Sequence, residues 1–334
     1  QFGSTYIQTA RPGGYDANLK WEQTATYNAG VDFGFLSNRI TGDIDVYLRK
    51  TSDLINLVPV PAGTNLTNQI VTNVGDLESR GVEFSVNGYL VNKSDFNWEV
   101  GFNASYNTNE ITKLTKVDDP DYKGIFVGGI SGGVGNNIQI HSIGFPAYSF
   151  YVLEQVYGTD GKPIEGLFVD RNQDGSITGD DRYRYQSPAP KVFMGFTSLV
   201  RYRDFDLTVN GRINLGNYVY NNVNSNYGAY AGMVASGYLS NRVTNVEFTN
   251  FENSSYFSDY YMENGSFMKL DNLSLGYNMS GLLKDMLNLR IYATAQNLIT
   301  VTKYSGLDPE VFSGIDNNIY PRPRIFLLGI SLTL

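Results

Sequence analysis

The residues with the most specific chemistry lie in the acidic segment 170–181, which reads DRNQDGSITGDD. Oxygen-bearing side chains recur at every second position, a glycine stands sixth and an acidic residue twelfth, which is the spacing of a calcium-binding loop. Calcium prefers about six to eight oxygen ligands. The spacing therefore predicts a Ca²⁺ site, and its candidate ligands are Asp170, Asn172, Asp174, Ser176, Thr178 and Asp181.

These candidate ligands differ in how they would bind the ion. Ser176 would use its backbone carbonyl, Thr178 its hydroxyl or a bound water, and the other four their side-chain oxygens. Gly175 permits the sharp turn that such a loop needs. The alternative is an acidic turn whose side chains cap backbone amides and hold no metal. No helices flank the segment in the sequence pattern, so a paired EF-hand is not predicted.

A second stretch, Gly129 to Gly133, fits the G-x-S-x-G pattern of a hydrolase nucleophile. That chemistry needs a buried strand before the serine and a helix after it. The residues that follow, VGNN, form helices poorly. His141, the one histidine of the chain, is the only available base of its type. We interpret the stretch as a loop, and the sequence predicts no enzyme.

The elements that must position these residues are strands. Segments of about ten residues alternate between apolar and polar side chains, which is typical of transmembrane β-strands. The C-terminal strand is apolar on one whole face, and we interpret the solvent on that face as lipid. The predicted spanning strands are 25–35, 40–48, 82–90, 98–106, 192–202, 205–215, 267–279, 289–297 and 325–334.

The connections between these strands alternate between tight links and long ones. The long links are 51–80, 109–190, 216–265 and 299–323. This alternation predicts an antiparallel up-and-down transmembrane β-barrel, with long extracellular loops and a periplasmic C-terminus. The calcium loop would then lie in the extracellular loop 109–190, where residues 148–157 form a non-spanning β element. About nine strands cannot close a barrel of even strand number, so we expect residues 1–334 to be the C-terminal part of a longer protein.

Composition supports a membrane protein and excludes other classes. No apolar run is long enough for a transmembrane helix, whereas 25 Tyr and 19 Phe suit the aromatic girdles of a barrel in outer-membrane lipid. The net charge of −8 disfavours nucleic acid as a partner, because a phosphate backbone needs a basic surface. The absence of cysteine excludes disulfides and thiolate metal sites.

Several motifs resemble one family in their order and spacing. They are Leu19–Thr24, Asn73–Glu83, Ala295–Leu298, Tyr304–Glu310 and Tyr320–Arg324. Together they resemble the SusC/RagA-type TonB-dependent transporters of Bacteroidetes outer membranes. The spacing from Gly329 to Leu334 also resembles, in part, the C-terminal signal of outer-membrane barrels.

This resemblance implies a 22-stranded barrel with an N-terminal plug and a TonB-contacting segment, of which only the C-terminal barrel part is expected here. It also implies active import of oligosaccharides, or of peptides in some branches, in the outer membrane of a Gram-negative bacterium. The implied partners are a SusD-like surface lipoprotein, which acts as a lid, and TonB, through the N-terminal region that this chain is expected to lack.

Two other functions remain open at this stage. A SusC-like barrel could serve as a structural or assembly subunit of an outer-membrane complex, or the chain could be a soluble β-rich carbohydrate-binding or adhesin module. The tyrosine-rich stretch 218–261 could contact sugars or pack against the lipoprotein. Charged residues of the strands are expected to line the polar lumen or contact the plug, and these are Glu83, Glu99, Arg212, Lys269, Asp271 and Arg290.

Overall fold

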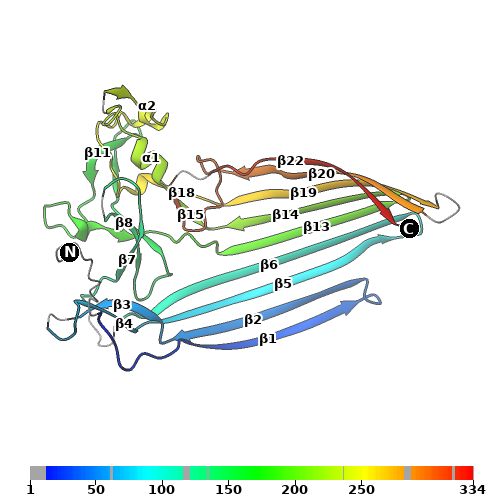
Figure 1. Cartoon of the computed structure of the whole chain (residues 1–334), viewed down its shortest axis with the longest axis horizontal. Coiled ribbons are helices and arrows are strands. Elements are labelled where there is room, and N and C mark those ends of the chain that lie inside the picture. Colours follow the sequence, from blue (N-terminus) through cyan, green and yellow to red (C-terminus); the bar gives the residue numbers. More distant parts are fainter. Residues whose placement is uncertain are drawn as a thin grey trace, which may run out of the picture.

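The computed structural model describes residues 13–60, 63–115, 121–133, 135–235, 237–281, 287–317 and 320–333. Nine long strands form one antiparallel sheet in which neighbours follow one another along the chain (Figure 1). They are β1 (Gln23–Phe35), β2 (Ile40–Ser52), β5 (Asp76–Asn92), β6 (Phe96–Lys113), β13 (Val192–Tyr202), β14 (Phe205–Leu215), β19 (Phe267–Gly281), β20 (Leu287–Thr302) and β22 (Ile325–Thr333). The predicted all-β, up-and-down architecture is confirmed.

One face of this sheet is apolar across its width. The register places Val46 opposite Val82, and Val82 opposite Tyr106, so that apolar side chains of successive strands share a face. These side chains are exposed rather than packed between two layers, and on β22 Leu328 is 81% and Ile330 66% exposed. An exposed apolar face of this extent is stable against lipid, which is the solvent of a transmembrane barrel.

Aromatic rings fill the space left by glycines throughout the sheet. In several cross-strand pairs a ring stands directly opposite a glycine and lies where a side chain would otherwise project. These pairs are Phe33–Gly42, Tyr47–Gly81, Phe196–Gly211 and Tyr292–Gly329. Each ring gains a close packing partner in the neighbouring backbone.

Strands β5 and β6 extend further than the alternation predicts. The ladder between them continues from Val82–Tyr106 through Glu78–Glu110 to Asp76–Lys113. In this extension polar side chains, those of Glu78, Arg80, Thr108 and Glu110, take the positions that are apolar further along the strands, so the alternation that marks the predicted strands 82–90 and 98–106 is lost there. The connection predicted to begin at residue 109 therefore begins at residue 114.

Tight turns and the C-terminus lie at one end of the sheet, and the long connections lie at the other (Figure 1). The tight turns described are 36–39, 93–95 and 203–204, and the fourth predicted tight link includes residues 282–286, which lie outside the described residues. Leu334, part of the C-terminal motif, also lies outside them. The predicted alternation of short and long links matches this arrangement.

The long connections fold into small sheets of their own. One contains β7 (Ile125–Gly129), β8 (Asn137–His141), β9 (Ser149–Val152) and β12 (Tyr183–Arg184), and another pairs β10 (Gln155–Tyr157) with β11 (Pro163–Phe168). Strands β9 and β10 thus lie outside the nine-stranded sheet, which confirms that residues 148–157 do not form a spanning strand.

The remaining elements of the connections are short. They are the hairpin β3 (Ile55–Pro59)–β4 (Gln69–Asn73), the sheet of β15 (Tyr218–Asn221), β18 (Met262–Asn264) and β21 (Ile315–Asp316), the hairpin β16 (Val234–Ala235)–β17 (Tyr238–Leu239), the helices α1 (Asn222–Tyr227) and α2 (Asn245–Thr249), and the 3₁₀ turns η1 (Gly179–Asp181) and η2 (Asp259–Tyr261). The two α-helices were not predicted. Neither they nor any other helix in the described part of the chain has the length and apolarity to cross a membrane.

The hydrophobic core of the chain lies in these connections rather than in the large sheet. Phe150, Val152 and Tyr220 are fully buried, and Tyr261 is 2% exposed. The expectation that the tyrosine-rich stretch contacts sugars or a lipoprotein is therefore wrong for Tyr220 and Tyr261. Their rings pack in the core, with centroids 6.3 Å apart.

Candidate functional site

The predicted calcium loop follows β11, ends with η1 and is closed by its own side chains. The Asp170 carboxylate accepts hydrogen bonds from the amides of Gln173 and Gly175 at 2.7 and 2.8 Å. The Asp174 carboxylate accepts from the amide of Ser176 at 2.8 Å. Gly175 has a φ of +85°, which favours glycine, so the turn predicted at this position is present.

Asp181, the predicted closing ligand, is fully buried beneath the loop. Its carboxylate accepts hydrogen bonds from the amides of Thr178 at 2.7 Å, Arg171 at 2.9 Å and Asn172 at 3.3 Å. The Thr178 amide foremost, with the other two amides, holds the pKa of Asp181 below its usual range although burial opposes this. Asp181 is therefore an ionised cap that fixes both ends of the loop.

Arg171 fastens the loop to the small sheet. Its guanidinium lies over the ring of Tyr183 at 4.5 Å and forms an ion pair with Glu154. The Tyr183 hydroxyl donates to Asp259 at 2.6 Å, and burial followed by this hydrogen bond raises the pKa of Tyr183. The loop is thus held against the aromatic core of the connections.

The candidate calcium ligands lie in this one loop, and each of their described hydrogen bonds serves to close it. Among the described residues, no group of three or more histidine or acidic side chains is placed to hold a metal ion. The donor set of carboxylate, amide and hydroxyl oxygens fits a hard cation. Calcium binding stays a prediction, and it requires Asp170, Asp174 and Asp181 to turn toward a common centre.

A second charged cluster ties the connection 303–324 to the water-facing side of the sheet. Lys269 on β19 donates to Asp308 at 2.8 Å and to Glu310 at 3.0 Å, and the Lys269 and Asp308 side chains are 6% and 8% exposed. Arg212 on β14 binds both carboxylate oxygens of Glu310, at 2.5 and 3.0 Å. A two-point guanidinium–carboxylate contact fixes orientation as well as distance.

Two further charges complete this cluster. Arg212 also pairs with Asp271 at 3.1 Å, and Arg322 pairs with Glu310 at 2.7 Å. Burial opposes ionisation of Asp308 and Glu310, but the hydrogen bonds from Lys269 outweigh it and the pKa values of both carboxyls lie below their usual range. The carboxyls of Asp308 and Glu310 are therefore ionised at neutral pH.

The structure places the predicted wall residues on the face opposite the apolar one. Glu83 stands opposite Asp45 and Ser105, and Glu99 stands opposite Tyr89. Three of the others, Arg212, Lys269 and Asp271, are joined in the cluster described above, and Arg290 pairs with Asp206. Sequence reasoning did not assign Asp308, Glu310 and Arg322 to this cluster, although all three lie in the motifs Tyr304–Glu310 and Tyr320–Arg324.

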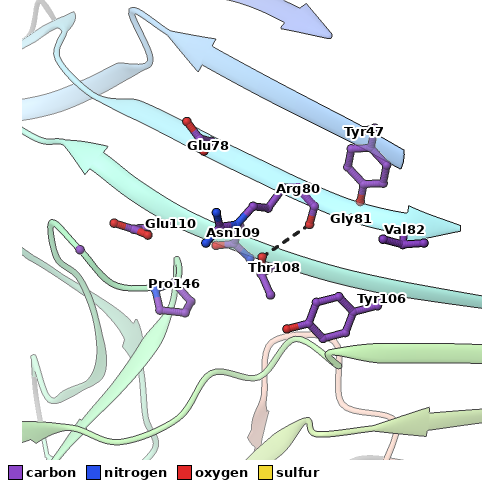
Figure 2. Close-up of a pocket in the computed structure, with 11 residues that line it drawn as sticks. Tyr47, Glu78, Arg80, Gly81, Val82, Tyr106, Thr108, Asn109, Glu110 and Pro146 are labelled. Carbon is purple, nitrogen blue, oxygen red and sulfur yellow. Dashed lines mark hydrogen bonds between the residues drawn. The ribbon is translucent and has the colours of Figure 1, made fainter. Parts of the chain in front are cut away.

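An open pocket of about 570 Å³ lies over β5 and β6, near the long connections (Figure 2). Its charged lining comes from facing positions of the two strands, where Glu78 stands opposite Glu110 and Arg80 opposite Thr108. Tyr47, Gly81, Val82, Tyr106, Asn109, Gly144 and Pro146 complete the lining. Such mixed charge with aromatic rings suits a polar ligand. The pocket was not predicted, because its lining joins residues of β2, β5, β6 and the segment 144–146, which are far apart in the sequence.

The G-x-S-x-G stretch has no nucleophile geometry. Ser131 follows the end of β7 and exchanges backbone hydrogen bonds with the Asn222 side chain, at 2.7 and 3.1 Å. His141 packs edge-on against Tyr148, with ring centroids 4.5 Å apart, and burial lowers its pKa. The stretch was interpreted from the sequence as a loop, and the structure shows that its Ser131 is held by the Asn222 side chain.

Comparison with known proteins identifies the family to which this chain belongs. Residues 1–298 match the family described as TonB dependent receptor-like, beta-barrel. The chain belongs to this family of TonB-dependent receptors. The family is one of receptors and transporters rather than enzymes, and membership places the receptor in an outer membrane. The alternative of a soluble carbohydrate-binding or adhesin module is thereby dropped.

Individual relatives agree with this assignment. The chain is 48% identical to the TonB-dependent receptor SusC of Bacteroides thetaiotaomicron over 99% of its own residues. It is 33% identical to the TonB-dependent receptor P3 of Formosa agariphila over 94% of its residues. It spans about a third of the length of each, 34% in both cases. In three dimensions it matches the RagAB peptide transporter with a TM-score of 0.75 and 27% identity, over 94% of this chain and 35% of that one.

Proposed function

We propose that this receptor segment works in the TonB-dependent import of oligosaccharides across the outer membrane, together with a SusD-like surface lipoprotein. The observation that carries the proposal is the 48% identity to SusC over nearly the whole chain. The apolar and polar faces of the sheet, which suit lipid and water, agree with it. Peptides are the second candidate substrate, because the structurally similar RagAB is a peptide transporter.

The proposal includes an orientation. The long connections with the candidate calcium loop face the cell exterior, and the tight turns with the C-terminus face the periplasm, as short periplasmic turns and long outer loops are usual in such barrels. The chain contains no cysteine, so a single introduced cysteine reports its own position without a background from this segment. Cysteine at Asp160, in the turn after β10, is expected to react with a membrane-impermeant maleimide in intact cells, and cysteine at Ser37 only after lysis.

The function is tested by deleting the gene in the bacterium that encodes it. Growth is then compared on single oligosaccharides and on a peptide digest as the sole carbon source. Loss of growth on an oligosaccharide supports the proposal, and loss on peptides alone replaces it with the second candidate. Unchanged growth on every source, with loss of the lipoprotein from the membrane, identifies the barrel as an assembly subunit.

Calcium at loop 170–181 is a separate part of the proposal. The fit lies in the donor chemistry and in the turn at Gly175, which brings Asp170, Asn172 and Asp174 into successive positions of one bend. The ion would offset two of the three negative charges of Asp170, Asp174 and Asp181 and stiffen the outer loop against the aromatic core. Its expected contribution is therefore to loop stability rather than to transport chemistry.

A further inference from the structure

The connection between β20 and β22 carries two exposed apolar side chains between buried anchors. Leu307 is 67% exposed and Phe312 is 105% exposed, so the ring of Phe312 lies clear of the rest of the described chain. Residues before, between and after them are buried, namely Tyr304, Asp308 and Ile315 at 5%, 6% and 5%. The two side chains thus project from a segment that is itself held in place.

The anchoring on both sides of Phe312 is polar and specific. On the N-terminal side Glu310 is held by Arg212 and Lys269, as described above. On the C-terminal side the Ser313 carbonyl accepts from the Gln139 side chain at 2.9 Å, and the Gly314 carbonyl accepts from the Tyr220 amide at 2.7 Å. Because the backbone is already ordered, a ligand that contacts Phe312 loses little free energy to loop ordering.

The connection that carries the ring is tied to the polar side of the sheet and not to its apolar side. The anchors Arg212 and Lys269 lie on the polar side of the sheet, and the connection leaves the sheet at the end where the long connections gather (Figure 1). Two apolar side chains, those of Leu307 and Phe312, are also a small surface for a protein partner. A phenylalanine offers about 150–250 Å², whereas a stable protein interface buries about 800 Å² on each side.

We propose that Phe312 is a stacking platform for a sugar ring of the imported oligosaccharide, at the outer mouth of the channel. The apolar C–H face of a pyranose matches the face of a phenylalanine ring, and its hydroxyl groups stay in water around it. The polar, exposed Ser313 follows the ring, so the apolar surface does not continue along the chain on that side. This inference rests on the proposed import of oligosaccharides.

The test uses the full-length receptor in its native membrane with its lipoprotein. The probes are radiolabelled linear hexasaccharides of glucose, mannose, xylose and galacturonic acid, offered singly to whole cells, and a radiolabelled peptide digest. The variants are Phe312→Ala, Phe312→Leu, Phe312→Trp and the matched control Phe35→Ala. Phe35 is an exposed phenylalanine at the opposite end of the sheet, beside a tight turn.

For the hexasaccharide whose uptake requires the gene, we expect Phe312→Ala and Phe312→Leu to raise the half-saturating concentration about tenfold. Phe312→Trp and Phe35→Ala should transport as the wild type does. Normal uptake by Phe312→Ala would overturn the inference and leave oligosaccharide import intact. Gene-dependent uptake of peptides alone, or of none of the probes, overturns both the inference and the oligosaccharide proposal.

A structural role for Phe312 has a separate readout. If the ring instead packs against another part of the full-length protein, Phe312→Ala should admit vancomycin or lose its resistance to heat in detergent gels. Entry of vancomycin or loss of heat resistance, together with a wild-type half-saturating concentration of the hexasaccharide in cells that still transport, would refute the stacking role. Retention of both properties together with weaker half-saturation supports it.

Discussion

Asp206 on β14 and Arg290 on β20 form an ion pair at 2.8 Å although β19 lies between their strands. They meet above Gly276, which stands opposite Asp206 in the register and whose missing side chain leaves the space that both charged groups occupy. A Cβ at this position would overlap the Asp206 carboxylate. The glycine is therefore required for the ion pair by space rather than by backbone conformation.

Gly276→Ala should displace this ion pair and lower the free energy of unfolding by about 1 kcal/mol relative to a matched control. The control is Gly88→Ala, because the nearest atoms to an added Cβ there lie at 3.6 Å, an ordinary contact. Both changes restrict the unfolded chain equally, so the difference between their free energies of unfolding reports the contribution of the Asp206–Arg290 ion pair. Urea unfolding of the full-length receptor in detergent measures it, and equal midpoints for the two variants would contradict the prediction.

Lys269→Met should release the connection 303–324 from the sheet. The change leaves Asp308 and Glu310 without their buried cation, and breaking a buried pair costs about 3–5 kcal/mol. Because the connection can detach locally, we expect faster trypsin cleavage at Lys303 rather than loss of the barrel. The control Lys50→Met breaks the exposed pair with Glu78 and should leave this cleavage rate unchanged. A cleavage rate equal to that of the wild type in Lys269→Met would show that the cluster does not hold the connection.

The same connection should loosen in acid. The folded pKa values of Asp308 and Glu310 lie below their ordinary values of 3.8 and 4.5, so their contribution is present above those values and is lost as pH falls through the lowered ones. Hydrogen exchange of residues 304–316 should therefore stay slow, after correction for its intrinsic pH dependence, at pH 5 and quicken below about pH 4. Fast hydrogen exchange of residues 304–316 already at pH 6 would contradict the view that Asp308 and Glu310 hold the connection.

Leu275→Lys should impair assembly of the barrel, whereas Ser274→Lys on the adjacent position should not. Leu275 is 52% exposed on the apolar face, and a lysine at the bilayer midplane costs about 2–4 kcal/mol. Ser274 lies on the polar face, where its hydroxyl is 2.8 Å from that of Thr294. Heat-resistant migration of the full-length receptor from outer-membrane fractions measures assembly. Equal assembly of both variants would mean that lipid does not cover the apolar face.

Calcium should protect loop 170–181 from proteolysis, and Asp170→Asn combined with Asp174→Asn should remove this effect. Asp180→Asn is the matched control, because Asp180 is 64% exposed, pairs with Lys123 and is not a candidate ligand. Protection of the loop from proteolysis is compared with added calcium and with a chelator. If calcium protects neither the wild type nor the control, residues 170–181 form an acidic turn that works without metal.

The sequence alone determined the strands and the two faces of the sheet. Side chains alternate with a period of two in a strand, so one apolar and one polar face are visible in the local order of residues. This is why all nine strands were predicted, and why the prediction ended where polar residues such as Glu78 and Glu110 take the positions of the apolar face. The turn at Gly175 was also local and was found for the same reason.

Only the tertiary structure decided which distant residues meet. Arg212 and Glu310 are 98 positions apart, and Asp206 and Arg290 are 84 apart, so no local pattern could pair them. Tyr220 and Tyr261 became part of the core because separate connections fold together around them. Such contacts depend on strand register and on the packing of loops, and these are settled by the whole chain at once.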